Sequence, residues 1–488
     1  MNQCTRRDFI AGATAIAGGA ALGLTWPGAV WSKVSGANDD IRLAIVGLRK
    51  KGIEHLEMFP KVPGVRIVAL CDADSQFLDL ETKKFMDRNE KVATYVDYRK
   101  LLDDKEIDAV VIVTPDHWHA LMTVWACQAG KDVYVEKPAS YSIWEGRKMI
   151  EAARKYKCIM QVGSQNRSDV GLRAAIPYIR QGNLGRIRRA RCFCYNPRES
   201  IGKVNGPQPV PRTLDYNLFM GPASLVPLTR RNLHYDWHWF WSTGTGEMGN
   251  IGAHNLDHCR WAINQSGLPQ RVISIGGRFA FDDDGQTPNT HLTFFDYKPV
   301  PIVFEIRALP RSKGHPAMDS TFRDIRTSMV IECEDGFFAG GRGGGWVYDK
   351  DGRKIKQFPG DGGAGHQANF IKAMRSRKVS DLRTDILKGH ISAALCHMAN
   401  ISYRLGRRES AEQIKNAIDE NTLLAEAFER MLAHLKANEV DLISEPLTIG
   451  PMLTFDAEKE KFAGRCSDWA NMLLKRNYRE PFVVPEKV

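Results

Sequence analysis

Residues 109–138 contain the pattern that most constrains the fold of this chain. They begin with an apolar, β-branched run at 109–113, which predicts a strand buried on both faces. A segment with helical spacing follows and stops at Gly130, and a short apolar strand at 133–135 comes next. Strand, helix and strand in this order predict a βαβ unit of a parallel sheet, with a ligand site at the carboxyl ends of its strands.

Lys137 stands at that edge, directly after the second strand and between Glu136 and Pro138. Most lysines are solvated surface charges, but no turn separates this one from a buried strand, and the proline after it fixes the chain direction. An ammonium in this place can hydrogen-bond the oxygen of an alcohol and stabilise the alkoxide that forms when a hydride leaves. Lys137 is therefore the first candidate catalytic residue.

A second pattern, closer to the N-terminus, predicts a dinucleotide site. A strand at 41–46 leads into Gly47 and Gly52 at the start of a helix, and a strand at 65–70 is followed by Asp72. This spacing places an acid on the ribose hydroxyls of an adenosine. The acid would repel a 2′-phosphate, so we expect NAD as the cofactor, with NADP as the alternative.

The glycine fingerprint of this site is incomplete. Its middle position, where the backbone must approach a pyrophosphate, is Arg49. Either Arg49, Lys50 or Lys51 meets the phosphates by charge, or the nucleotide site is weakened or lost. We take the first as the prediction for Arg49 and Lys50. The remaining predicted cofactor contacts lie in the motifs TPDHWH and EKP: Thr114, Pro115, His119, Glu136 and Lys137.

From about residue 187 the sequence changes to strands with alternating faces, separated by hairpin signals such as Asp335-Gly336 and Asp351-Gly352. We expect an α/β chain with an N-terminal Rossmann domain and a C-terminal α+β domain built on a large, mostly antiparallel open sheet. The glycine-rich run at 340–345 has no helix after it, so it is interpreted as a connection between strands rather than a phosphate site. The predicted limits are 1–37 for a signal peptide, 38–163 for the Rossmann domain, 164–445 for the second domain, 365–406 for helices that bridge both domains, 414–436 for a further helix, and 446–488 for a tail.

The N-terminal residues are typical of a twin-arginine export signal. They combine the pair Arg6-Arg7, an apolar stretch rich in Ala and Gly, and the small-residue end Ser35-Gly36-Ala37. The apolar stretch is short and rich in glycine, which disfavours a stable membrane anchor. We therefore expect a periplasmic or extracytoplasmic protein. Because a dissociable nicotinamide is not recycled there, any cofactor must be loaded before export and then kept.

Charge and cysteine usage exclude two other classes. The net charge is +11, but the basic residues alternate with acids and form no long run with interleaved aromatics, which argues against nucleic-acid binding. The ten cysteines contain no CxxC pair and stand mostly in apolar contexts. This pattern predicts buried free thiols rather than a disulfide framework.

Four motifs together carry a family resemblance: VYVEKP, TPDHWH, QVGSQNR and GTGEMGNIGAHNLDHCRW. With them the chain resembles the Gfo/Idh/MocA family of glucose-fructose oxidoreductases, inositol dehydrogenases and rhizopine catabolism proteins, over most of residues 41–406. The resemblance implies NAD or NADP between a Rossmann domain and an α/β domain, sugar or polyol substrates, and an open sheet that often mediates homo-oligomers. It also implies that Lys137 is the lysine of EKP and that His254 is the histidine that acts as acid or base.

Asn250 departs from the family pattern. It stands four residues before His254, where the dehydrogenases of the family have an acid. An asparagine can orient a hydroxyl by hydrogen bonds but cannot relay a proton, so His254 would work with solvent, Lys137 or Asp257. Asn250 is kept as a catalytic candidate beside Lys137 and His254. The predicted substrate contacts are Arg167, Trp239, Asn250, His254 and Asp257.

Histidine and aromatic clusters leave alternatives open. His254 and His258 lie one helical turn apart, and His234 and His238 repeat this spacing, which could serve a zinc ion. A catalytic His254, a buried structural histidine and a metal ligand are the three interpretations, and we predict the first, with no metal. The aromatic run at 234–241 fits either stacking on a sugar ring or core packing.

The sequence as a whole predicts an exported NAD(P)-dependent oxidoreductase that acts on a sugar, glycoside or polyol and keeps its cofactor tightly bound. Such an enzyme would regenerate its own cofactor by reducing a second substrate. The alternative is a redox-neutral, NAD-dependent glycoside hydrolase or lyase that oxidises its sugar transiently. A non-catalytic sugar-binding relative is a third hypothesis, motivated by Arg49 and Asn250.

Overall fold

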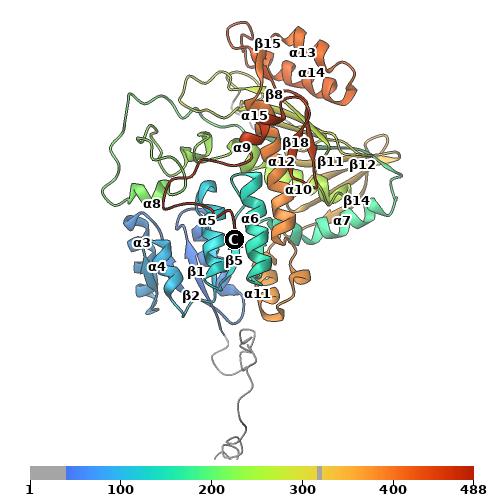
Figure 1. Cartoon of the computed structure of the whole chain (residues 1–488). Coiled ribbons are helices and arrows are strands. Elements are labelled where there is room, and N and C mark those ends of the chain that lie inside the picture. Colours follow the sequence, from blue (N-terminus) through green and yellow to red (C-terminus); the bar gives the residue numbers. More distant parts are fainter. Residues whose placement is uncertain (1–39, 316–320) are drawn as a thin grey trace, which may run out of the picture. The chain divides into compact units, whose positions relative to one another are not determined.

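The computed structural model of the protein describes residues 40–315 and 321–488 (Figure 1). The predicted signal peptide at 1–37 lies outside the described residues. Within the described ranges, no helix is both long enough and apolar enough to cross a membrane.

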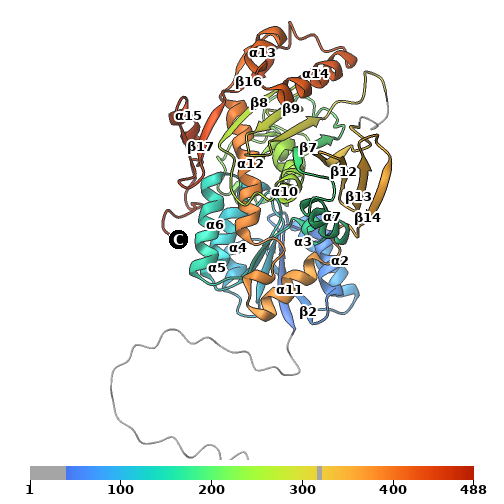
Figure 2. The same cartoon turned by 90° about the vertical axis from the view of Figure 1, so that its right-hand side faces the viewer.

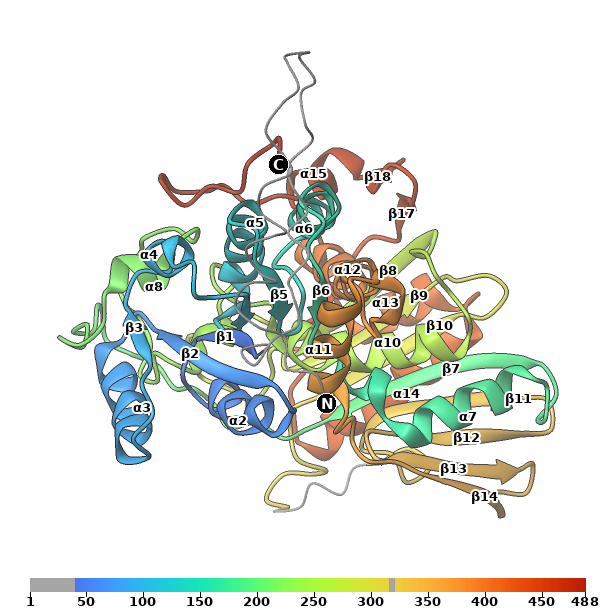
Figure 3. The same ribbon diagram turned by 90° about the horizontal axis from the view of Figure 1, so that it is seen from below.

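The N-terminal part is organised around a six-stranded parallel sheet with the order β3-β2-β1-β4-β5-β6 (Figure 3). The order reverses between β1 and β4, and in open parallel sheets ligands bind at this point, outside the carboxyl ends of the strands. The predicted Rossmann fold is therefore confirmed. The strands are β1 Ile41–Val46, β2 Val65–Cys71, β3 Ala93–Tyr95, β4 Ala109–Ile112, β5 Asp132–Val135 and β6 Met160–Val162.

Helices cover both faces of this sheet. Every residue of β4 and β5 is buried, which is why their sequences are apolar without a period. Apolar side chains of α4, α5 and α6 share a core with one face, and those of α3 and α11 share a core with the other, beside α2. These helices are α2 Lys51–Met58, α3 Ser75–Asp87, α4 Tyr98–Asp103, α5 His119–Gln128, α6 Ile143–Lys155 and α11 His366–Ser376.

The C-terminal part is organised around a twelve-stranded sheet. All its pairings are antiparallel except that of β7 with β10, which confirms the predicted mostly antiparallel sheet. The glycine-rich run at 340–345 joins β12 to β13 in a hairpin, as expected of a connection. The strands are β7 Ile187–Tyr195, β8 Arg271–Gly277, β9 Thr290–Phe295, β10 Ile302–Arg307, β11 Thr327–Cys333, β12 Gly336–Gly341, β13 Gly344–Asp349, β14 Lys354–Pro359, β15 Arg407–Glu409, β16 Leu447–Ile449, β17 Leu453–Asp456 and β18 Lys461–Ala463.

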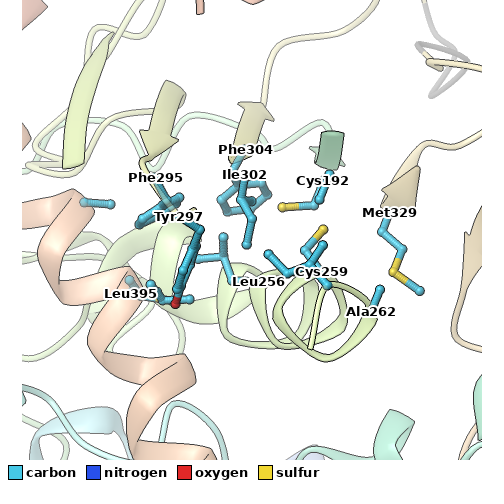
Figure 4. Packing of buried hydrophobic residues seen from close by; sticks show 14 of the residues in the cluster. Cys192, Leu256, Cys259, Ala262, Phe295, Tyr297, Ile302, Phe304, Met329 and Leu395 are labelled. Carbon is cyan, nitrogen blue, oxygen red and sulfur yellow. The ribbon is translucent and has the colours of Figure 1, made fainter. Parts of the chain in front are cut away.

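Helix α10, Gly252–Ala262, packs across the inner face of the second sheet. Its residues Leu256 and Cys259 lie against Cys192 of β7 and Phe304 of β10 in a single apolar cluster (Figure 4). Helix α7, Val170–Arg180, adds to the same cluster. All nine cysteines of the described residues are free and seven of them are buried, as predicted from their apolar contexts.

The opposite face of β8, β9 and β10 is covered by two helices, α13 Ala411–Ile418 and α14 Thr422–Ala437. The prediction of a single helix at 414–436 was wrong. The helix is interrupted before Asn421, whose side chain accepts a hydrogen bond from the backbone N–H of Leu424 and so caps the start of α14.

Helix α12, Ile386–Arg404, connects the two sheets (Figures 1 and 2). Near its N-terminus Gly389 lies against Val162 of β6, and near its C-terminus the Ser402 hydroxyl accepts a hydrogen bond from the backbone N–H of Ser274 in β8, at 3.1 Å. The last segment of the chain returns to the Rossmann part, where Phe482 is buried in the core. The domain limits remain predictions.

We predict that Gly389→Ala lowers the free energy of unfolding by about 1–3 kcal/mol. An alanine normally favours a helix over glycine, but here the added Cβ would overlap the Val162 side chain and push α12 away from β6. Gly267→Ala is the matched control, because nothing lies within 4 Å of its added Cβ and its φ is not positive. Urea unfolding of both variants measures the difference, and equal stabilities would contradict this account of α12.

Candidate active site

A cavity of ≈310 Å³ opens at the carboxyl ends of the Rossmann strands. Its floor is formed by the segments that follow β1, β2, β4 and β5, and its other side by residues of the second domain between 218 and 250. The cavity therefore lies where the order of the parallel strands reverses. Asp72, Lys137 and Asn250 are among the residues that line it.

The turn after β1 keeps the first and last glycines of a dinucleotide fingerprint for steric reasons. Gly47 has φ +93°, and a Cβ there would lie 2.8 Å from the Val113 carbonyl oxygen. A Cβ on Gly52 would overlap the Gly47 carbonyl oxygen. Only glycine fits at either position, so the helix starts close against the strand as a dinucleotide turn requires.

Basic side chains replace the middle glycine of the fingerprint. The Arg49 guanidinium lies 4.6 Å from the ring centre of Phe77, and Lys50 Nζ lies 4.2 Å from that of Tyr235. Lys50 adopts φ +26°, a strained conformation for a residue with a side chain. Arg49, Lys50 and Lys51 all line the cavity, which is what charge-based binding of phosphates requires.

Asp72, in the cavity wall, is held by two backbone donors. One carboxylate oxygen accepts from the N–H of Leu48 at 2.8 Å and the other from that of Asp74 at 3.0 Å. Burial raises the pKa of Asp72 to about 6, although both hydrogen bonds act to lower it. The carboxylate is thus oriented by the turn itself.

Lys137, which also lines the cavity, is held by Asn250. Its Nζ donates to the backbone oxygen of Asn250 at 2.8 Å and to the side-chain Oδ1 at 3.1 Å. Asn250 ends the short helix α9, Gly246–Asn250, so this contact joins β5 of the first domain to the second domain. It uses two of the three donors of the ammonium and leaves one for a ligand.

The carboxylate of Glu136, the residue before Lys137, is held in place by two side chains. Its carboxylate accepts from Gln165 Nε2 at 2.8 Å and contacts His55 Nε2 at 2.9 Å. Burial alone would raise the pKa of Glu136, but the contact with His55 and the nearby lysine charges hold it well below its usual range. A permanent negative charge therefore lies directly beside Lys137.

His254 lies one helical turn after Asn250, on α10. It is not among the residues that line the cavity. Burial, followed by the charge of Lys137, lowers the pKa of His254 well below its usual value, so the ring is neutral. Its buried Nδ1 has no hydrogen-bond partner in the described chain.

The structure brings most of the predicted cofactor residues together. Thr114, Pro115 and His119 line the cavity, and the two ring nitrogens of His119 face the carbonyl oxygens of Pro138 at 2.7 Å and Thr114 at 2.9 Å. His119 therefore ties the loop after β4 to the loop after β5. Its predicted role becomes one of holding the cavity wall in shape.

Besides His254, three predicted substrate contacts lie outside the cavity. Arg167 and Asp257 form a buried, two-pronged ion pair with distances of 2.7 and 2.8 Å, which Arg260 extends at 3.1 Å. Burial alone would raise the pKa of Asp257, but Arg167 and then Arg260 hold it well below its usual range. Trp239 lines a separate small pocket with Arg198. For these three residues the geometry favours a structural role.

Sequence reasoning passed over other residues that line the cavity. Tyr235, Trp237 and His238 belong to the aromatic run from which only Trp239 was chosen, and the run alone does not reveal which members point inward. Asp116, in the TPDHWH motif, is buried and accepts from the Thr245 hydroxyl at 2.6 Å. Burial raises its pKa. Its position directly after a strand edge was the clue.

The histidine pairs have other partners than a metal. His234 contacts Asp74 at 2.9 Å, His238 contacts the Tyr235 carbonyl oxygen at 2.6 Å, and His258 contacts the Ser328 hydroxyl at 3.0 Å. In residues 40–315 and 321–488, no group of three or more metal-ligating side chains is found.

Comparison with protein families agrees with this architecture. Residues 41–164 match the model described as "Oxidoreductase family, NAD-binding Rossmann fold", and residues 193–283 match "Oxidoreductase family, C-terminal alpha/beta domain". Two regions of the chain therefore match the two domain models of the Gfo/Idh/MocA oxidoreductase family. The resemblance stated from its motifs is confirmed to this extent.

Sequence relatives are matched over about a third of the chain. A glycosyl hydrolase family 109 protein of a Shewanella species is 30% identical over 153 residues, which are 30% of this chain and 33% of that protein. An α-N-acetylgalactosaminidase of Shewanella oneidensis is 28% identical over 172 residues, or 34% of this chain and 37% of that protein. The chain thus spans about a third of the length of the curated relatives it matches.

Solved structures share the fold over most of the chain. The WlbA dehydrogenase of Bordetella pertussis, solved with NADH and UDP-GlcNAcA, aligns with a TM-score of 0.55 at 18% identity, covering 75% of this chain and 97% of that one. An aldose-aldose oxidoreductase of Caulobacter crescentus, solved with glycerol, aligns with a TM-score of 0.53 at 15% identity, covering 73% and 95%. At these identities the likeness establishes the fold.

We predict that Asp257→Asn lowers the free energy of unfolding by about 3–5 kcal/mol at pH 7, because it leaves two buried guanidinium groups without their carboxylate. The native pKa of Asp257 is depressed, so its stabilising contribution is present above the unfolded value near 4 and is lost as the pH falls below it. The gap between wild type and variant should narrow below about pH 4. Urea unfolding at several pH values measures it.

The control is Glu439→Gln, which removes an ion pair with Lys313 in which both side chains are 66% exposed. It should change stability by less than about 1 kcal/mol at every pH. An Asp257 variant as stable as this control would contradict the structural role of the buried pair.

Proposed function

We propose that the protein is an NAD(P)-dependent oxidoreductase that acts on a sugar, glycoside or polyol and keeps its nucleotide bound. The observation that carries the proposal is a single cavity whose wall contains both Asp72 and the Lys137–Asn250 pair. An adenosine ribose would bind at Asp72, and the reacting alcohol would lie at Lys137. When bound, nicotinamide supplies a hydride acceptor.

The residues around the turn after β1 fit a dinucleotide. Backbone approach is kept by Gly47 and Gly52, and the phosphates would be met by Arg49, Lys50 and Lys51. Asp72 favours NAD, because its carboxylate would repel a 2′-phosphate. NADP remains the less favoured alternative.

Lys137 would donate its free N–H to the substrate oxygen and stabilise the negative charge that develops on it. The neutral imidazole of His254 would take the proton, relayed from the cavity past Lys137, since His254 does not itself line the cavity. Asn250 would orient the ammonium. In this scheme Lys137 stabilises the charge on the substrate oxygen inside the cavity, and His254, outside the cavity lining, accepts the proton.

Tight retention of the nucleotide is supported by a segment of the second domain that covers the adenosine end. Leu214 pairs with Asp74 in an isolated β-bridge, and Thr213 accepts from the Ser75 N–H at 2.9 Å. Trp118 Nε1 donates to the Leu218 carbonyl oxygen at 3.0 Å. A nucleotide under this segment could leave only if several such contacts opened together.

A redox-neutral glycosidase is the second candidate, favoured by the sequence relatives described as family 109 glycosyl hydrolases. In that case the same Lys137 and His254 would serve a transient oxidation, elimination and reduction. Release of an aryl group from aryl glycosides without added NAD would favour it. A product with a net loss of two electrons would exclude it.

Export by the twin-arginine route and assembly into homo-oligomers remain further parts of the proposal. Export rests on the Arg6-Arg7 motif, and periplasmic location of the mature chain after fractionation would test it. A captive nucleotide is what an enzyme working outside the cytoplasm requires. Export and a tightly bound nucleotide therefore support one another as parts of the proposal.

We predict that purified protein, once denatured, releases about one nicotinamide nucleotide per chain, and that Lys137→Met keeps this nucleotide while losing about 10²–10⁴-fold in kcat on its best sugar. The loss follows from removing the donor to the developing alkoxide. Lys61→Met, on the exposed surface, is the control and should match the wild type. A wild type that releases no nucleotide and binds no added NAD would favour a non-catalytic relative instead.

The affinity of the stripped protein for NAD should fall as the pH drops below about 6. Ribose hydroxyls donate to the ionised Asp72, so each pH unit below its pKa weakens binding by up to about tenfold. Asp72→Asn should bind NAD weakly and without this dependence. Fluorescence titration from pH 5 to 8 measures both, and an identical slope in the variant would exclude Asp72 as the group that titrates.

A further inference from the structure

Asn250 is joined to a second acid that sequence spacing did not single out. Its Nδ2 donates to Glu247 Oε2 at 3.1 Å, within the same short helix α9. Glu247 is only 2% exposed, and its other oxygen accepts from Arg198 Nη2 at 2.6 Å. A carboxylate is thus present in the site, one side chain farther from Lys137 than a direct ion pair would place it.

The hydrogen bonds leave one orientation for the Asn250 amide. Lys137 can only donate, so it requires Oδ1, and the Glu247 carboxylate can only accept, so it requires Nδ2. An amide flip would set Nδ2 against the ammonium and Oδ1 against the carboxylate. Glu247 therefore decides which atom of Asn250 meets Lys137.

The same network continues to the phosphate-binding turn. Arg198 Nη1 donates to the Tyr235 hydroxyl at 3.2 Å, and the Tyr235 ring carries Lys50 Nζ on its face. Side chains from both domains thus form a chain around the cavity, from the turn after β1 to the end of β5. Glu247 is the member that carries negative charge.

We propose that Glu247 is a positioning residue for the reaction, which fixes Lys137 by holding the amide of Asn250 in one orientation. Together, Glu247 and Asn250 replace the acid expected at position 250: the amide touches the ammonium, and the carboxylate orients the amide. The inference rests on the proposed function, because it assigns a role in the chemistry of Lys137. It adds a residue that neither the motifs nor the comparisons assign.

Exchanging the acid and the amide tests this arrangement. In Glu247→Gln, the new carbonyl satisfies Arg198 and the new NH₂ faces Asn250 Nδ2, so the Asn250 amide turns and Lys137 loses Oδ1. In Asn250→Asp, two carboxylates face each other across the 3.1 Å contact. In the double variant, the new amide at position 247 donates to the new carboxylate at position 250, and that carboxylate accepts from Lys137.

We expect each single variant to lose at least about tenfold in kcat and the double variant to return to within about threefold of the wild type. Nucleotide content, measured after denaturation, should stay near that of the wild type in all three. Glu334→Gln is the matched control, since it changes an acid paired with the exposed Arg186 and should leave kcat unchanged. If Glu247 had only a structural role, the single variants would be less stable, but the double variant would not recover the kcat that they lose.

Single variants that keep wild-type kcat, or a double variant that is slower than both, would overturn the positioning role while leaving the proposed function intact. A wild type that holds no nucleotide and turns over no sugar would overturn both. The two failures are distinguishable, because the second shows in the wild type and the first only in the variants.

Discussion

The contact between Lys137 and Asn250 is the interaction on which the candidate site depends. It spans two domains, because Lys137 follows the parallel strand β5 and Asn250 ends helix α9 of the second domain. It is one of several contacts that hold the second domain over the edge of the Rossmann sheet, beside those of Trp118 with Leu218 and of Asp116 with Thr245. The second domain thus contributes both a wall to the cavity and the group that orients its central cation.

The burial of acids around this contact divides their roles. His55, Lys51 and Lys137 hold the pKa of Glu136 well below its usual range despite its burial, whereas burial raises the pKa of Asp116. The pKa values of two carboxyl groups close to the same lysine are therefore shifted in opposite directions by their surroundings. Neither shift can be deduced from the motifs EKP and TPDHWH, because it depends on the burial of each group and on partners such as His55 that are far away in the sequence.

Much of the fold could be predicted from local patterns. The largely apolar run at 41–46, the uninterrupted apolar run at 109–113 and the hairpin signal at Asp335-Gly336 lie where the structure has strands and a turn. The sequence could not predict that strands after residue 445 extend the second sheet, because they are short and lack a clear period. It also missed the break at Asn421, where a capping side chain divides an otherwise continuous apolar pattern.

The site residues that follow directly after strands could be predicted from the sequence, and the others could not. Gly47, Asp72 and Lys137 stand at strand edges, where topology alone determines position. Arg167 and Asp257 are polar residues in a family motif, but the structure pairs them with each other, which no spacing rule foretells. Likewise, Trp237 and Trp239 are two residues apart in the sequence, and only the structure shows that Trp237 lines the cavity and Trp239 does not.

The burial of Phe482 in the Rossmann core has a consequence for how the protein is made. During synthesis the first domain emerges before the second, yet Phe482, a side chain of its hydrophobic interior, is translated after the strands of the second sheet. The apolar core of the first domain is therefore complete only once the second domain has been translated.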